Sequence, residues 1–191
     1  IFYSYFKSFY SNNKYIKYAT ARAGNVIGGG DMKKDRIVPD IIKSFINNSS
    51  LLIRNPRAVR PWQHVLEPIY GYLILGHYLI KNKIKKNTKP NWNFGPNPSS
   101  FKTVSEVIKA IISEWGLKKK IIIKKNKAFE ESNLLKLNSN KAKKELKWCP
   151  RLDFKETISL TVEWYKTFEY NQNLEEITTK QINYFLEKDN L

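Results

Sequence analysis

Arginine is concentrated in one stretch near the start of the chain. The chain has only six arginines but 28 lysines, and five of the six arginines fall within residues 22–60. A planar guanidinium group can grip a phosphate or carboxylate through two parallel hydrogen bonds, which a lysine ammonium group cannot do. Because lysine is the general cation of this chain, the arginines predict a site for an anionic, phosphorylated ligand. They are Arg22, Arg36, Arg54, Arg57 and Arg60.

Two other polar side chains of this stretch could also contact a ligand. Asn25 lies near the end of a strand-like run, and strand carboxyl ends open to ligands in α/β sheets. Its amide is therefore a candidate hydrogen-bond donor, the alternative being a turn asparagine that satisfies its own backbone. His64 titrates near neutral pH and could act as a base, or it could be packed in the core.

The glycines at 28–30 do not form a dinucleotide-binding turn. Such a turn needs the spacing Gly-x-x-Gly-x-x-Gly after a first strand, so that a pyrophosphate can sit on a helix N-terminus. The three glycines are consecutive and follow a late strand.

The elements that must position these residues alternate between short strands and helices, which predicts an α/β fold. Residues 31–35 form a polar loop, and Thr103 with Glu106 and Asp153 with Glu156 fit capping boxes. Ser139 is a further candidate cap. The predicted strands or extended segments are 15–27, 51–53, 60–66, 91–94 and 120–124. The predicted helices are 1–12, 38–47, 67–81, 103–115, 139–146, 153–170 and 178–188.

Composition narrows the class of protein. The chain has 191 residues, of which 41% are hydrophobic, enough to bury a core. The net charge of +17 would ordinarily suggest nucleic acid or an anionic membrane, but the lysines are scattered, so we expect neither partner. The single cysteine, Cys149, excludes an intrachain disulfide and fits a reducing, cytoplasmic compartment. We expect no metal site.

Several phrases resemble one family of enzymes. They are RAGNVIGGGD at 22–31, DRIVPDI at 35–41, RNPRAVRPWQHVLEP at 54–68, NFGP at 93–96, LKLN at 135–138, KAKKELKW at 141–148 and TVEWYK at 161–166. In order and spacing they resemble the C-terminal part of an extended short-chain dehydrogenase/reductase that acts on nucleotide sugars. The long phrase at 54–68 resembles the CDP-glucose 4,6-dehydratases in particular.

The resemblance implies a fold and a division of the chain. Residues 1–30 would be the last part of a truncated, Rossmann-like dinucleotide-binding domain. Residues 31–191 would be the smaller, nucleotide-sugar-binding α/β subdomain with interleaved return elements. The implied cofactor is NAD and the implied substrate a CDP-hexose. A separate N-terminal half and, for the complete protein, a homo-oligomer are further implied partners.

The resemblance also implies residue roles. Two positions depart from the family pattern, because Glu130 replaces a histidine and Asn138 an aspartate. The implied substrate-binding residues are Asn25, Arg36, Val38, Arg60, Asn93 and Glu131, and the implied pocket wall contains Trp62 and His64.

No catalytic residue is expected in this chain. The family uses a Tyr-x-x-x-Lys pair, which Tyr3 and Lys7 match only superficially, because about three helical turns are missing between Tyr3 and the next strand. We therefore expect a substrate-binding fragment that is inactive alone. The alternatives are a fragment of an NAD-dependent epimerase or decarboxylase, and a non-catalytic basic binding module.

Overall fold

The α/β architecture is confirmed in the computed structural model, which describes residues 2–10, 13, 15–53, 55–81, 89–116, 123–125 and 134–188. Helices and short strands alternate along these ranges. The helices are α1 (Phe2–Tyr10), α2 (Ile37–Ile46), α3 (Leu66–Lys81), α4 (Val104–Trp115), α5 (Phe154–Glu169) and α6 (Leu174–Glu187). The strands are β1 (Thr20–Ala23), β2 (Asn25–Ile27), β3 (Leu51–Ile53), β4 (Val59–His64), β5 (Asn91–Phe94), β6 (Phe101–Thr103) and β7 (Ile123–Lys125).

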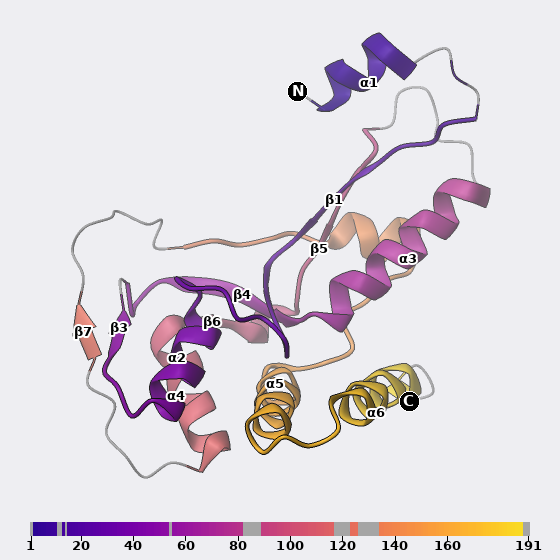
Figure 1. The fold of residues 1–191 in the computed structure, drawn as a ribbon. Coiled ribbons are helices and arrows are strands. Elements are labelled where there is room, and N and C mark those ends of the chain that lie inside the picture. Colours follow the sequence, from indigo (N-terminus) through magenta and orange to yellow (C-terminus); the bar gives the residue numbers. More distant parts are fainter. Residues whose placement is uncertain are drawn as a thin grey trace.

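The strands form three small sheets. β1 pairs with β5 in parallel, and β3 pairs with β7 in parallel. The third sheet has the order β2-β4-β6, in which β2 and β4 are parallel and β4 and β6 antiparallel. Figure 1 shows β1 and β5 running side by side toward α1, with α3 beside them, while α2 and α4 lie near β4 and β6.

The single strand predicted for residues 15–27 is wrong. The chain makes two short strands there, and they belong to different sheets, with Gly24 between them. A Cβ atom at Gly24 would lie 2.6 Å from the carbonyl oxygen of Pro61, so only glycine allows this close approach. The change of sheet at Gly24 brings Asn25 beside Trp62 on β4.

Two predicted helix starts are confirmed as capping boxes. The Thr103 and Asp153 side chains accept the backbone N–H of Glu106 and Glu156, at 3.1 Å and 2.8 Å. Each glutamate in turn accepts the backbone N–H of its partner. These reciprocal bonds satisfy N–H groups that a helix leaves without intrahelical partners.

One other predicted helix start is wrong, and one predicted side-chain cap is not formed. The final helix begins at Leu174 rather than 178, because the Asn173 side chain accepts the backbone N–H groups of Glu175 and Glu176. The Ser139 hydroxyl does not cap its helix but donates to the Gly95 carbonyl, while the Asn138 side chain accepts the Asn140 N–H. The turn that follows, η2 (Ala142–Leu146), is a π-helix.

Two apolar clusters hold the elements together. One lies between α2, α4, α5 and the strands β2 to β4, with Ile41, Ile108 and Ile111 almost fully buried. The other joins α3, β5 and η2, where Phe94 and Trp148 meet edge to face with centroids 5.1 Å apart. None of the helices in the described ranges is long and apolar enough to cross a bilayer.

Candidate functional site

A cavity of about 620 Å³ lies beside strands β2 and β4. Its walls come from β2 with Gly28 and Gly29, from the loop that leads into α2, from the first turn of α2, and from β4 with Val65. The start of α4 closes it through Val104. The cavity therefore lies where the β2–β4 pair meets the N-terminal ends of two helices.

Five of the residues that were expected to bind the substrate or to form the pocket wall are found around this cavity. Asn25 comes from β2, Arg36 and Val38 from the loop and first turn of α2, and Arg60 and Trp62 from β4. Thirty-seven positions separate Asn25 from Trp62, yet the two are register partners across the parallel strands. The fold thus gathers residues from three separate segments around one space.

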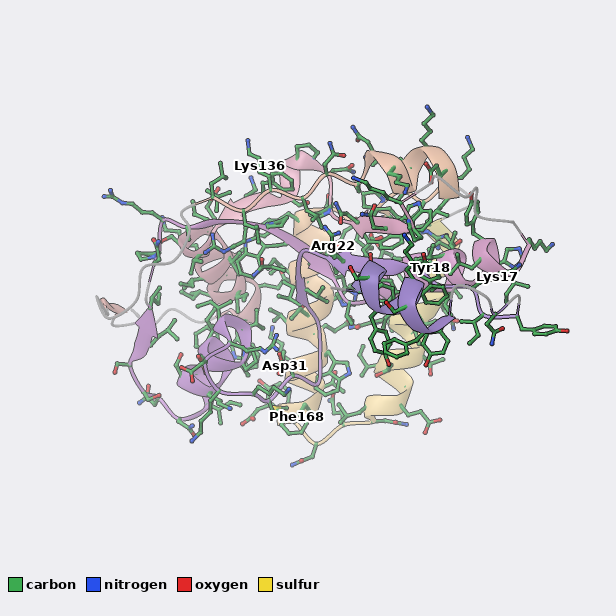
Figure 2. The ribbon with its side chains drawn as sticks, turned by 90° about the horizontal axis from the view of Figure 1, so that it is seen from above. Lys17, Tyr18, Arg22, Asp31, Lys136 and Phe168 are labelled. Atoms are coloured by element: carbon green, nitrogen blue, oxygen red, sulfur yellow. The ribbon has the colours of Figure 1, made fainter. Side chains whose placement is uncertain are left out.

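Two expected residues, Asn93 and His64, lie elsewhere in the fold. The Asn93 amide is on β5, where it donates to the Asn138 carbonyl at 3.1 Å. His64 is buried, only 2% exposed, and is not among the lining residues. Glu131 lies outside the described residues, as does Arg54. Arg22 is exposed on β1 (Figure 2) and does not line the cavity.

The cavity carries more positive than negative side chains. Lys33, Arg36 and Arg60 line it together with Asp31 and Asp35. Asp31 and Arg36 form an ion pair, with 3.6 Å between Oδ2 and Nε. The sequence predicts a polar loop at residues 31–35 but does not by itself place the charges of that loop in the site. The sequence does contain a pattern that could have indicated these charges, since charged residues directly follow a glycine run at the end of a strand.

The first turn of α2 adds a second attraction for an anion. Arg36, its N-cap residue, is extended at φ −114° and ψ 130° and makes no side-chain capping bond. The next residues, Ile37 and Val38, line the cavity. A helix N-terminus carries partial positive charge and N–H groups that bind phosphate and carboxylate oxygens.

His64 is unsuited to act as a base. Burial lowers its pKa to about 4, so the ring is neutral at pH 7. Its Nδ1 accepts the Leu66 N–H at 3.4 Å, which places the proton on Nε2. Nε2 lies 3.6 Å from where a Cβ at Gly28 would stand, so the ring is behind the cavity wall.

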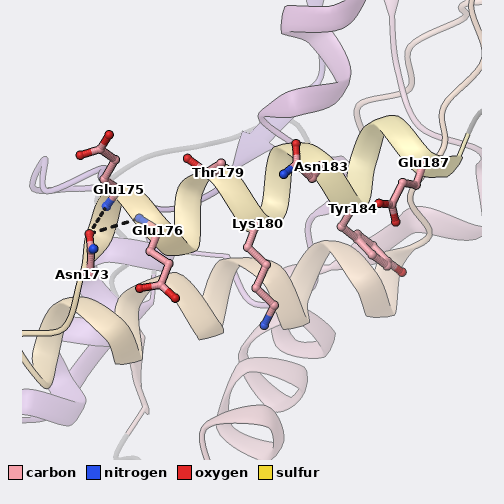
Figure 3. Close-up of a pocket in the computed structure, with 8 residues that line it drawn as sticks. All are labelled: Asn173, Glu175, Glu176, Thr179, Lys180, Asn183, Tyr184 and Glu187. Carbon is pink, nitrogen blue, oxygen red and sulfur yellow. Dashed lines mark hydrogen bonds between the residues drawn. The ribbon is translucent and has the colours of Figure 1, made fainter.

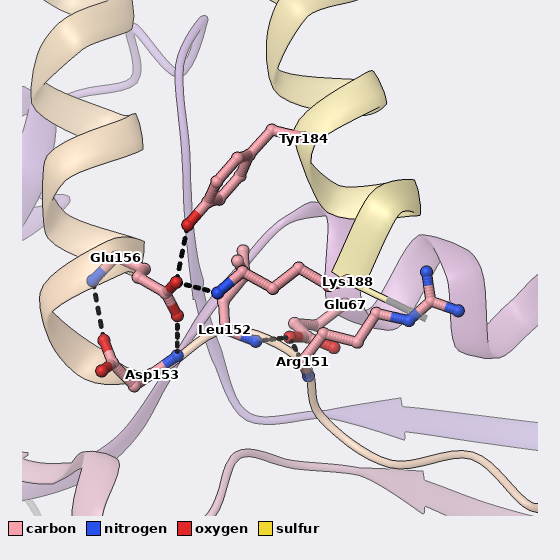
Figure 4. Close-up of polar contacts among 7 residues, drawn as sticks. All are labelled: Glu67, Arg151, Leu152, Asp153, Glu156, Tyr184 and Lys188. Carbon is pink, nitrogen blue, oxygen red and sulfur yellow. Dashed lines mark hydrogen bonds and ion pairs between the residues drawn. The ribbon is translucent and has the colours of Figure 1, made fainter. Parts of the chain in front are cut away.

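Glu67 is a second buried titratable group, and it links elements rather than lining the cavity. Its Oε1 accepts the backbone N–H groups of Arg151 and Leu152, both at 2.7 Å (Figure 4). Its Oε2 is buried and has no hydrogen-bond partner among the described residues. Burial raises the pKa of Glu67 to about 7 despite those two N–H bonds. The side chain thus ties the start of α3 to the segment before α5.

A wider hollow of about 830 Å³ lies along α6 (Figure 3). All of its lining residues belong to that helix or its N-cap, so it is an open helix face rather than an enclosed site. Glu175, Glu176 and Glu187 outnumber Lys180 there, and Lys180 is already paired with Glu163 at 2.9 Å. An acidic face repels phosphate, so the β2–β4 cavity is the better candidate.

Gly29 of the site is required by packing. A Cβ at Gly29 would stand 2.0 Å from Cδ2 of Trp164 on α5, so the glycine is needed for that contact. No group of three histidine, cysteine, aspartate or glutamate side chains in the described ranges could hold a metal ion.

Comparison with known proteins shows what the chain resembles. No family model matches the chain. CDP-glucose 4,6-dehydratase of Salmonella typhimurium is 38% identical over 168 residues, which cover 88% of this chain and 46% of that protein. The chain is a homologue of CDP-glucose 4,6-dehydratase. It matches the C-terminal half of that enzyme, and so spans about half the length of the relative.

Solved structures show the same fold. The dTDP-glucose 4,6-dehydratase of Bacillus anthracis, in complex with NAD, aligns with a TM-score of 0.68 at 23% identity, over 88% of this chain and 49% of that one. The UDP-glucose 4-epimerase of Thermotoga maritima, with UDP-glucose, aligns with a TM-score of 0.69 at 21% identity, over 88% and 50%. The chain therefore has the fold of about half of these dehydratase and epimerase chains.

Proposed function

We propose that this chain is the substrate-binding portion of a nucleotide-sugar 4,6-dehydratase, and that its β2–β4 cavity binds a CDP-hexose. The observation that carries the proposal is the convergence of Asn25, Arg36, Val38, Arg60 and Trp62 on one cavity. The similarity to a CDP-glucose 4,6-dehydratase supports the choice of ligand.

In this proposal the two arginines hold the diphosphate. Arg36 and Arg60 line the cavity from different elements, and each carries a planar guanidinium group that can bind a phosphate through two hydrogen bonds. The N-terminus of α2 adds backbone N–H groups at Ile37 and Val38. Asn25 donates its amide to the sugar or diphosphate, and Trp62 and Val104 supply an apolar wall. A sugar held at its diphosphate in this way is oriented for reaction, which lowers the entropic part of the barrier.

The proposal also gives each part of the chain a role in the complete enzyme. Residues 1–30 would end a dinucleotide-binding domain and residues 31–191 would form the sugar-binding subdomain. NAD would supply the redox chemistry of the complete enzyme, but the glycines present here are committed to packing, so we assign NAD no contact in this chain. Its partners would be a dinucleotide-binding half and, in the complete enzyme, a second copy.

Substitution of Arg60 tests the proposed site. Arg60→Lys keeps the charge but removes the bidentate fork, so we expect CDP-glucose affinity to fall by about 1–3 kcal/mol. Isothermal titration of the chain with CDP-glucose measures this loss. Arg57→Lys is the matched control, because Arg57 is exposed and does not line the cavity. Equal effects of the two substitutions would refute the site.

The net charge of +17 favours one alternative, a basic module that binds nucleic acid. Such binding weakens steeply as salt rises, because it releases counterions from the phosphate backbone. The same titrations at two salt concentrations, with CDP-glucose and with a DNA duplex, separate the two functions. Salt-sensitive DNA binding without CDP-glucose binding would support the alternative.

A further inference from the structure

The cavity loop, residues 28–36, is fixed by contacts that come from far along the sequence. Inside the loop, the Asp31 carboxylate accepts the Lys33 N–H at 3.1 Å and pairs with Arg36 at 3.6 Å. The first contact shapes the loop backbone at Lys33, and the second places the guanidinium group of Arg36, which lines the cavity.

Helix α5 holds this loop from behind. The Tyr165 hydroxyl donates to the Asp31 carbonyl oxygen at 2.6 Å, although 134 positions separate the two residues. Trp164 fills the space beside Gly29, and its ring stacks on Phe168 with centroids 6.0 Å apart. The loop has one more anchor, from Lys43 Nζ to the Met32 carbonyl at 2.8 Å.

The Tyr165 contact is built to persist at neutral pH. The side chain is fully buried. Burial, with a smaller contribution from the Asp31 charge, raises the pKa of Tyr165 to about 12, so the hydroxyl keeps its proton and remains a donor. Packing in the apolar core explains why the ring of Tyr165 is buried. It does not explain why the hydroxyl group donates a hydrogen bond to the Asp31 carbonyl.

We infer that Tyr165 is a positioning residue for the cavity: its hydrogen bond to the Asp31 carbonyl fixes the loop so that Asp31 holds Arg36 where a phosphorylated ligand would bind. The inference rests on the proposed function of the cavity. It assigns to α5 a part in ligand affinity, although α5 contributes no residue to the cavity lining.

Tyr165→Phe tests the inference, because it removes the hydroxyl and keeps the ring. We expect CDP to bind about threefold to tenfold more weakly, the range that one lost hydrogen bond gives. Tyr170→Phe is the matched control, since Tyr170 follows the same helix and is 65% exposed. Isothermal titration with CDP measures all variants.

A double-mutant cycle with Arg36→Ala separates positioning from general stability. If Tyr165 acts through Arg36, Tyr165→Phe should change CDP affinity less than twofold in the Arg36→Ala background. The same loss in both backgrounds, or wild-type affinity in Tyr165→Phe alone, would overturn the inference.

Hydrogen exchange makes the test independent of ligand binding. We expect faster amide exchange for residues 31–36 in Tyr165→Phe, with the amides of α5 unchanged. If CDP fails to bind even the wild-type chain, the proposed function fails, and exchange alone decides whether Tyr165 positions the loop. Unchanged exchange in residues 31–36 would overturn the inference in that case.

Discussion

At the scale of single residues, two buried titratable side chains at the end of β4 are shifted in opposite directions by the same cause. Burial lowers the pKa of His64 from 6.5 to about 4 and raises that of Glu67 from 4.5 to about 7. Each shift favours the neutral form, because taking a charge out of water is costly. Neither residue lines the cavity, so we expect both to affect stability rather than ligand binding.

The two groups should give the free energy of unfolding opposite pH dependences. Folded Glu67 holds its proton more tightly than unfolded Glu67, so its contribution falls as pH rises from 4.5 to 7. Unfolded His64 holds its proton more tightly than folded His64, so its contribution rises from pH 4 to 6.5. Each shift corresponds to about 3 kcal/mol. In the wild-type chain the two slopes should largely cancel between pH 4.5 and 6.5.

Denaturant unfolding across pH 4–7 checks this cancellation. In Glu67→Gln, we expect stability relative to wild type to increase by up to about 3 kcal/mol as pH rises from 4.5 to 7. In His64→Gln, we expect the relative stability to decrease over pH 4–6.5. A pH-independent difference between either variant and the wild type would show that the residue does not titrate as its burial implies.

At the scale of elements, α3 stands out because its outward face is apolar. Ile69, Tyr72, Leu73 and Ile80 follow one another at helical spacing and are 47%, 41%, 68% and 75% exposed. The neighbouring strand β1 pairs only with β5 among the described strands, so its other edge offers unpaired backbone groups. Exposed apolar surface of this kind commonly marks an interface.

The isolated chain should therefore self-associate through this face. Leu73→Lys places a charge in its centre, and we expect it to shift the chain toward monomer in sedimentation velocity. Leu186→Lys is the matched control, because Leu186 is an exposed apolar residue, 48% exposed, on α6. A wild-type chain that is monomeric at high concentration, or a control that dissociates it equally, would contradict this prediction.

At the scale of the whole molecule, the chain spans about half the length of the relatives it matches. Within that half it contains the β2–β4 cavity, which we propose binds a phosphorylated ligand. It does not contain the Gly-x-x-Gly-x-x-Gly turn, and the Tyr3 and Lys7 pair, which fits the pattern Tyr-x-x-x-Lys, precedes β1 by too few residues.

The purified 191-residue chain should not convert CDP-glucose and should not bind NAD tightly. The physical reason is that neither a pyrophosphate turn nor a placed acid–base pair is present in its sequence. Mass spectrometry that follows the loss of water from CDP-glucose, with NAD added, checks this outcome. Turnover would contradict the prediction, and its disappearance in Tyr3→Phe would assign the activity to the Tyr3 and Lys7 pair.

The sequence alone predicted features that depend on neighbouring residues. The capping boxes at Thr103 and Asp153 are local exchanges of hydrogen bonds over three positions, and both were predicted correctly. The strands at 51–53 and 91–94 were also predicted at their observed bounds, because each is a short β-prone run ended by turn residues. The arginine content of residues 22–60 predicts an anion site, and of these arginines Arg36 and Arg60 line the cavity.

Only the tertiary structure decided which of these residues meet. The break at Gly24 depends on Pro61, and the Ser139 hydroxyl is drawn away from its helix by Gly95, 44 positions earlier. Asn25 and Arg36 reach the cavity while Asn93 does not, because β5 pairs with β1 and not with β2. Short-range hydrogen bonds and residue chemistry depend on residues that are neighbours in the sequence. Burial and contacts between distant segments arise only when the strands pair and the helices pack.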